Sequence, residues 1–194
     1  MDASNKNHYH SLARVRKSCS TQRVPLNGSF RMNTYSGASF HDAPTPASGL
    51  AEWQSLMQRG CDAARCGNTA LAGHLYQQSL VIAKSLMAYG GGFSADDRLA
   101  AFVVTRLNLA DLHNDLDEPQ AAVAHLCGAH ETLMALVRDP TGDPDMQQAA
   151  CRHSRETHAA LLAYLSEYGS HPAVLDALRA GCMPFPLARS HTLH

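Results

Sequence analysis

Apolar side chains recur from residue 51 onward at the spacing of an amphipathic helix. In the first stretch, Trp53, Leu56, Met57 and Cys61 lie at positions i, i+3, i+4 and i+8, which places them on one helix face. Five further apolar stripes run over Ala72–Met87, Leu99–Ala110, Ala122–Val137, Ala149–Tyr168 and Val174–Leu178. No segment alternates between apolar and polar residues long enough to predict a strand. The pattern predicts an all-α domain of three antiparallel helix hairpins in series.

Capping and breaking residues separate these stripes. Asn68 is expected to cap the second helix, since its side-chain oxygen can accept a hydrogen bond from the first helical turn. Ser94 and Asp97 have the spacing of a capping box at the start of the third helix. Pro119 suits the first turn of the fourth helix. Residues 139–145 hold two prolines and a glycine, which predicts a non-helical loop before the fifth helix.

The chain divides into three parts by composition. Residues 1–48 are rich in Ser, Asn, Thr, Gly and Pro without an apolar period, which predicts a disordered tail that ends in a linker over 41–49. Residues 49–182 form the predicted helical domain. Residues 183–194 are expected to be a C-terminal tail.

Charge is balanced over the chain but divided unevenly. The formal net charge is −1, which disfavours nucleic acid as the main partner. Residues 1–50 nevertheless carry six basic and two acidic side chains, a net of +4, whereas residues 51–194 carry ten basic and fifteen acidic ones, a net of −5. A mildly basic tail therefore precedes a mildly acidic domain, and the tail could contact nucleic acid, an acidic partner or its own domain.

The sequence predicts a cytoplasmic location without membrane contact. No apolar run approaches the ~20 residues of a membrane-spanning helix, and the first residues lack the apolar stretch of a secretory signal. The six cysteines are therefore interpreted as reduced thiols.

One segment is similar to a tetratricopeptide repeat. The matching positions are Leu56, Gly60, Ala63, Gly67, Ala72, Tyr76 and Ser79. In this pattern, small residues at Gly60 and Ala72 let the paired helices approach, and Tyr76 fills the space between them. A second unit around Ala110 and Leu126 fits more loosely, 50 residues later rather than the ~34 of the ideal repeat. A third unit is weaker still.

The resemblance to the tetratricopeptide (TPR-like) superfamily implies a right-handed array of helix pairs with a concave groove for a protein or peptide. In that superfamily the first helix of each pair lines the groove. The resemblance thus implies eight partner-binding candidates, with Arg106 and Asn108 the most central: Gln54, Gln58, Arg65, Arg106, Asn108, His113, Arg152 and Arg155.

The sequence offers no catalytic, cofactor or metal motif. Twelve histidines are present, but His125–His130 and His153–His158 are five apart rather than the three or four that place two ligands on one helix face. Cys127 and His130 are three apart, which leaves a thiol or metal sensor as a minor alternative. No phosphate-binding glycine motif or nucleophile elbow occurs. We therefore expect no enzyme activity, no cofactor and no metal.

These observations favour a non-enzymatic adaptor that binds and regulates a partner protein. The specific hypothesis is sequestration or inhibition of a bacterial transcription regulator. The alternatives are a secretion-type chaperone and nucleic-acid binding through the basic tail. Homodimerisation is a further expectation, because short repeat arrays expose their terminal apolar faces.

Overall fold

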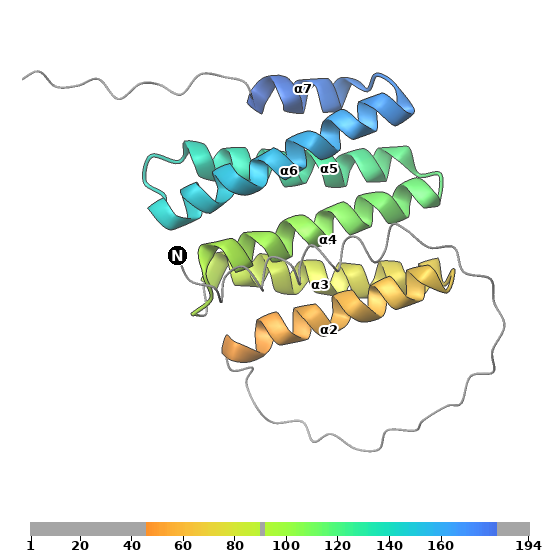
Figure 1. The fold of residues 1–194 in the computed structure, drawn as a ribbon, viewed down its shortest axis with the longest axis horizontal. Helices are drawn as coiled ribbons and strands as arrows, with labels where there is room; N and C mark the ends of the chain where they lie inside the picture. The colour runs from red at the N-terminus through yellow and green to blue at the C-terminus, as the bar shows by residue number, and fades with distance from the viewer. Residues whose placement is uncertain (1–45, 90–91, 182–194) are drawn as a thin grey trace, which may run out of the picture.

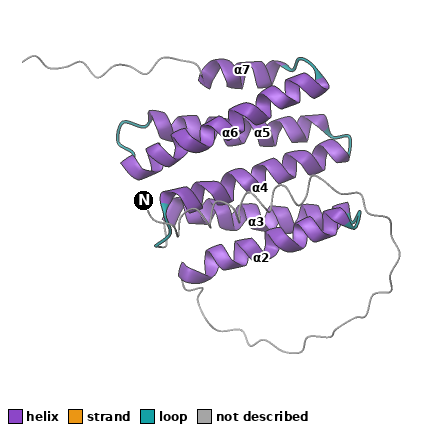
Figure 2. Cartoon of the chain, in the orientation of Figure 1, coloured by secondary structure: helices purple, strands orange, loops and turns teal. Residues whose placement is uncertain are grey.

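The computed structural model describes residues 46–89 and 92–181 of the chain, and these residues form helices joined by short turns. The helices are α2 (Pro46–Arg65), α3 (Thr69–Tyr89), α4 (Ala95–Asp115), α5 (Pro119–Arg138), α6 (Pro144–Tyr168) and α7 (Pro172–Gly181). The described part of the chain contains no strand (Figure 2). The prediction of an all-α fold is therefore confirmed.

Each helix packs against the next one along the chain, from α2 to α7. Alternate helices also touch: α4 contacts both α2 and α6, and α5 contacts α7. The array thus has α2, α4 and α6 side by side, with α6 crossing in front of α5 in Figure 1. The helices α2 and α7 lie at its two ends (Figure 1).

The centre of the array is α4. Every residue from Leu99 to Ala110 is buried except Arg106, which is half-buried. Burial on all faces requires neighbours on all faces, and α4 contacts α2, α3, α5 and α6. A helix in such a position is apolar around its whole circumference. Its polar residues are therefore the exceptions that need an explanation.

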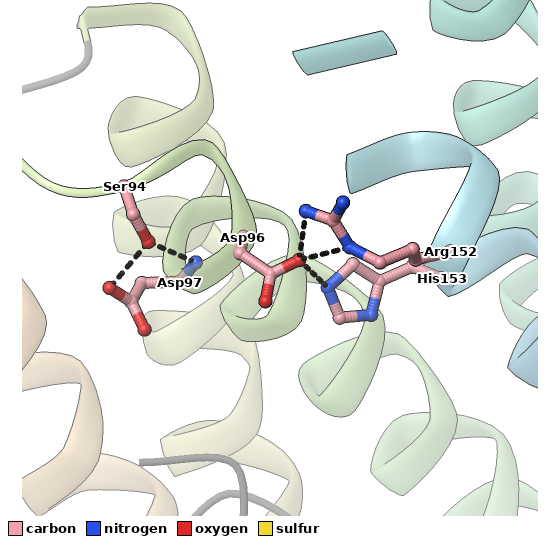
Figure 3. Close-up of polar contacts among 5 residues, drawn as sticks. All are labelled: Ser94, Asp96, Asp97, Arg152 and His153. Atoms are coloured by element: carbon pink, nitrogen blue, oxygen red, sulfur yellow. Dashed lines mark hydrogen bonds and ion pairs between the residues drawn. The ribbon is translucent and has the colours of Figure 1, made fainter. Parts of the chain in front are cut away.

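The predicted caps are confirmed. The Asn68 side chain accepts a hydrogen bond from the backbone N–H of Leu71 at 3.2 Å. The Ser94 hydroxyl accepts from the N–H of Asp97 at 3.1 Å and donates to the Asp97 carboxylate at 2.7 Å (Figure 3). Pro119 is the first residue of α5.

Two predicted helix starts were wrong. The helix α2 begins at Pro46, inside the stretch 41–49 interpreted as linker, and α6 begins at Pro144, inside the loop 139–145. The physical reason is the same in both places, because a proline in the first turn lacks only an N–H that would have no partner there. The Asp143 carboxylate then caps α6 by accepting from the N–H of Asp145 at 3.0 Å. The remainder of the predicted tails, 1–45 and 183–194, lies outside the described residues.

The repeat-like contact between α2 and α3 is present. A Cβ added to Gly60 would lie 2.5 Å from ring carbon Cε1 of Tyr76, closer than packed carbon atoms approach. Both Tyr76 and Ala72 are buried, and the Tyr76 hydroxyl donates to the Cys61 sulfur at 3.5 Å. Only glycine at position 60 permits this helix spacing.

The cysteines differ from the prediction in one case. Cys66, Cys127 and Cys151 carry free thiols, whereas Cys61 is disulfide-bonded. The interpretation of all six as reduced thiols is therefore wrong for Cys61. Searched over its described residues, the structure has no helix long and apolar enough to cross a membrane.

Candidate functional site

The eight candidate residues do not form one cluster. On α2, Gln54 is half-buried, and Gln58 and Arg65 are exposed. Both exposed side chains bond within their own helix, since the Gln58 amide donates to Asp62 Oδ1 at 3.1 Å and Arg65 forms an ion pair with the same oxygen. The three lie on one face of α2, because positions 54, 58 and 65 are separated by nearly whole turns.

On α6, Arg152 joins two helices. Its Nε and Nη2 atoms donate to Asp96 Oδ1 of α4 at 3.2 and 3.0 Å (Figure 3). The Nε2 atom of the neighbouring His153, which is buried, lies 3.3 Å from the same oxygen. Arg155 lies on the next turn and is exposed. The carboxylate of Asp96 therefore connects the start of α4 to α6, a contact that sequence reasoning missed because 56 residues separate the partners.

Asn108 occupies the interior. Its side chain is only 2% exposed, and its amide donates to the carbonyl of Val104 one turn earlier at 2.8 Å. Asn108 lies two residues from Arg106, which places the two side chains on nearly opposite faces of α4. This position does not suit the partner-binding role expected of Asn108.

Arg106 and His113 belong to a group of basic side chains at the junction of α3, α4 and α5. We use the term basic cluster for Lys84, Arg106, His113 and His125. Arg106 and His113 are seven residues apart and share one face of α4. The rings of His113 and His125 are stacked, with centroids 5.3 Å apart and planes inclined by 11°.

Gly128 makes room for the Arg106 guanidinium. A Cβ added at Gly128 would lie 2.8 Å from Arg106 Nη1. The guanidinium also lies over the ring of Phe102, 5.3 Å from its centroid. Since His125 precedes Gly128 by one turn of α5, the same helix face presents both residues to α4.

Two polar atoms of the basic cluster are buried without a hydrogen-bond partner among the described residues. They are Nε of Arg106 and Nδ1 of His125. Burial lowers the pKa of Arg106 below its usual value. Burial, followed by the charges of Arg106, His113 and Lys84, lowers the pKa of His125 to about 4. His125 is therefore a neutral imidazole at pH 7.

The side chain of His113 is held in place by a residue of the loop between α4 and α5. Its Nδ1 atom lies 2.6 Å from a carboxylate oxygen of Glu118. Glu118 is the residue directly before α5, so the contact holds the end of α4 against the start of α5. The loop therefore sets the position of the stacked histidine pair.

A second buried histidine lies beneath α7. The Thr157 hydroxyl donates to the carbonyl of Ser154 at 3.1 Å, so it accepts from His130 Nδ1 at 2.9 Å. The other ring nitrogen, Nε2, is buried, and a Cβ on Gly181 would lie 2.7 Å from it. Burial, followed by the charges of His158 and Arg138, lowers the pKa of His130.

The thiol next to this histidine is not set up for reactivity. Burial and the charge of Glu131 raise the pKa of Cys127 to about 11, so it stays protonated at neutral pH, whereas reactive cysteines are thiolates. A search of the described residues for three or more His, Cys, Asp or Glu side chains that could hold a metal finds none.

Lys84 and His125 are functional candidates that sequence reasoning missed. The available signal was His125 itself, a polar residue next to the apolar stripe of Ala122, Val123 and Leu126. Lys84 gave no signal, because α3 is the second helix of its pair and the resemblance implied that the first helix of each pair lines the groove.

The fold and these contacts define an all-helical array whose interior holds several partly satisfied polar groups. A family model described as "Protein of unknown function (DUF2753)" matches residues 51–193, and the chain belongs to this family. Comparison with curated proteins and with solved structures finds no match.

Proposed function

We propose that the chain is a cytoplasmic, non-enzymatic adaptor with a TPR-like arrangement of three helix hairpins. In this proposal it binds and sequesters a partner protein, with a transcription regulator as the specific candidate. The observation that carries the proposal is the contact between alternate helices, in which α4 touches α2 and α6 while α5 touches α7.

The contact between Gly60 and Tyr76 supports the TPR-like part of the proposal. In a repeat of helix pairs, small residues at fixed positions set the helix spacing, and Gly60 admits the ring of Tyr76 in this way. In the second unit, the corresponding positions Ala110 and Leu126 are also buried. Such arrays use the exposed side chains of one layer to bind partners.

The layer of α2, α4 and α6 is the binding surface in this proposal. Its exposed polar side chains include Gln58 and Arg65 at one end and Arg152 and Arg155 at the other. Arg155 is the best anchor among them, because Arg is enriched at the energetic centres of protein interfaces and none of the hydrogen bonds or ion pairs described above engages it.

The decisive experiment begins with the intact chain as bait in native lysate. A captured protein is then purified, and its affinity for the chain is measured by calorimetry. Gln58→Ala with Arg155→Ala should weaken binding by about tenfold or more. The matched control is Arg179→Ala on α7, an exposed arginine outside this layer, which should leave the affinity unchanged.

The identity of the partner separates the hypotheses. A transcription regulator that loses DNA binding when captured supports the proposal. An export substrate favours the secretion-type chaperone. Nucleic acid released at moderate salt favours binding through residues 1–48. A second copy of the chain, measured by light scattering, favours homodimerisation. If the double variant and the Arg179→Ala control bind the partner with equal affinity, the layer of α2, α4 and α6 is not the binding surface.

A further inference from the structure

The last helix, α7, is held in the array by a small set of contacts. It lies at one end and touches only α5 and α6 among the described helices (Figure 1). Of its 10 residues, Val174 and Ala177 are the buried ones. A helix of this length is marginal in water without tertiary packing. Whether α7 is docked therefore depends on the groups beneath it.

Two side chains of α5 meet the last turn of α7. The Arg138 guanidinium donates a hydrogen bond to the carbonyl of Ala180. The ring of His130 lies against the next residue, since a Cβ added to Gly181 would be 2.7 Å from Nε2. His130 is only 2% exposed. The end of α7 therefore covers the Nε2 atom of this histidine.

The docked position of α7 suits only the neutral form of the ring. The Thr157 hydroxyl donates to the carbonyl of Ser154, so it accepts from the proton on Nδ1 of His130 at 2.9 Å. Nε2 then carries a lone pair, and it has no hydrogen-bond partner among the described residues. A proton added there would create a buried N–H donor that faces Gly181 and has no acceptor, which costs free energy.

The charges around His130 also oppose a second ring proton. They belong to Arg138 of α5 and to His158 of α6, whose ring centroid is 5.9 Å from that of His130. No carboxylate of the described residues is among the charges that act on the ring. Glu131, the acid next to it in the chain, is exposed and acts on Cys127.

The helix α7 supplies no anion that would compensate a charged ring. Its one acid, Asp176, is exposed and forms an ion pair with Arg179 at 3.0 Å. The negative end of a helix dipole attracts cations, but at α7 the Arg138 guanidinium already takes that position. Burial, followed by the two neighbouring positive charges, accordingly lowers the pKa of His130.

We propose that His130 is a pH-sensitive latch for α7, in which a proton taken up from solvent at Nε2 releases α7 from α5 and α6, and loss of that proton docks the helix again. Release lets water hydrate the charged ring, and it uncovers the apolar side chains of Val174 and Ala177. The helix that moves lies outside the layer of α2, α4 and α6, so the latch does not depend on the proposed partner surface.

The direction of the pH dependence follows from the two states of the ring. In the released chain the pKa of His130 is the ordinary value near 6.5, whereas in the docked chain it is lower. The released chain therefore binds more protons below about pH 6.5, and a fall in pH favours release. While the docked ring stays neutral, each unit of decrease in pH raises the ratio of released to docked chain by up to about tenfold.

The test is amide hydrogen exchange of the intact chain, followed by nuclear magnetic resonance between about pH 7 and about pH 5, a range that includes the ordinary histidine pKa. Protection factors, which compare each amide with an unstructured one at the same pH, measure how often a helix opens. Amides of α7 should be less protected than those of α3 by about tenfold or more, because α7 opens locally. Their protection should fall by up to about tenfold for each unit that the pH is lowered below about 6.5.

Two histidine variants assign the proton. His130→Asn retains an N–H for the Thr157 hydroxyl but does not titrate, so the protection of α7 should no longer fall as the pH is lowered. His125→Gln is the matched control, since His125 is another histidine of α5 with a lowered pKa. This variant should leave the pH dependence of α7 unchanged, because release of α7 does not involve His125.

Four results would overturn the proposal. Equal protection of α7 and α3 would show that α7 opens only when the whole domain unfolds. Protection of α7 that does not change with pH would show that its docking takes up no proton. A steep fall that persists in His130→Asn would place the proton on another group, and loss of the fall in His125→Gln would make it a property of global unfolding. If His130→Asn does not fold, His130→Gln replaces it, and the unaltered chain and His125→Gln still provide the other comparisons.

Discussion

Gly60 and Gly128 provide the same kind of space for two different occupants. Each lies inside a helix, and each lacks the Cβ that would meet a large side chain from the facing helix. At Gly60 that side chain is the ring of Tyr76, at 2.5 Å from the added Cβ, and at Gly128 it is the guanidinium of Arg106, at 2.8 Å.

The occupants differ in how well their polar atoms are satisfied. Tyr76 is 2% exposed, and its hydroxyl donates to the Cys61 sulfur. Arg106 is half-buried with its Nε unpaired among the described residues. Burial of an apolar ring stabilises a fold, whereas burial of an unpaired charge opposes it. The comparison teaches that one glycine serves packing, whereas the other keeps a charge in place at a cost to stability.

The largest expected effect is at the first glycine contact. Tyr76→Ala should lower the free energy of unfolding by about 3–5 kcal/mol, because it leaves a cavity the size of an aromatic ring. The loss in free energy of unfolding is measured by urea titration, with circular dichroism as the probe. Tyr76→Phe is the control and should cost about 1 kcal/mol or less, since it keeps the ring and removes the hydroxyl that donates to the Cys61 sulfur. A cost below 1 kcal/mol for Tyr76→Ala would contradict the packing role.

Adding one methyl group to each glycine tests the comparison directly. Gly60→Ala should destabilise by about 1–3 kcal/mol, because the ring of Tyr76 is confined and has to move. Gly128→Ala should lie within about 1 kcal/mol of the unaltered chain, since the flexible end of Arg106 can move and alanine favours the helix. Thermal and urea unfolding of both variants provide the measurement. Equal losses of stability in Gly60→Ala and Gly128→Ala would show that the two glycines do not differ in their packing role.

The Tyr76 contact should also limit stability at alkaline pH. Burial, followed by the charge of Asp111, raises the pKa of Tyr76 to about 12. An acid whose pKa is raised on folding stabilises the protein below the unfolded value, here near 10, and that contribution is lost as the pH rises toward 12. Tyr76→Phe should flatten the fall of Tm above pH 10. Tyr89→Phe, at an exposed tyrosine, should not.

The basic cluster should limit stability on the acidic side, by a smaller amount because water screens a half-exposed ring. The pKa of His125 is about 4 in the folded chain and near 6.5 when unfolded. The unfolded chain therefore binds more protons between these values, so stability falls as the pH drops from 6.5 to 4. His130 adds to this trend, because its pKa is also lowered. His125→Gln should reduce the slope in a series of urea titrations, whereas His74→Gln, at an exposed histidine, should leave it intact.

The sequence predicted one glycine contact and not the other for a physical reason. Gly60 and Tyr76 are sixteen residues apart, within one helix pair, where helical spacing alone determines which side chains meet. Arg106 and Gly128 also lie in consecutive helices. The charge of Arg106, however, favours an exposed position when only the sequence is known, so no packing contact with a glycine was expected. Arg106 is half-buried because α4 has neighbours on every side, which is a property of the whole array.

The same limit explains the other differences. Asn108 was expected to line the groove because the resemblance places it on the first helix of the second unit, yet its amide is buried and donates to the carbonyl of Val104. Pro46 and Pro144 were interpreted as breakers because proline ends helices, although it also begins them. The bond between Asp96 and Arg152 depends on how α4 and α6 are packed. Local rules predicted the helices and their caps, whereas contacts between alternate helices required the assembled structure.

The pattern of helix contacts has a kinetic consequence. No contact between the described helices reaches beyond the second helix along the chain. The loops that must close are therefore short, and closing them costs little chain entropy. Helical proteins with such local topology fold in microseconds to milliseconds. Each helix of this array can dock onto its predecessor while the chain is still being synthesised, so the order of the helices is also an order in which the domain can assemble.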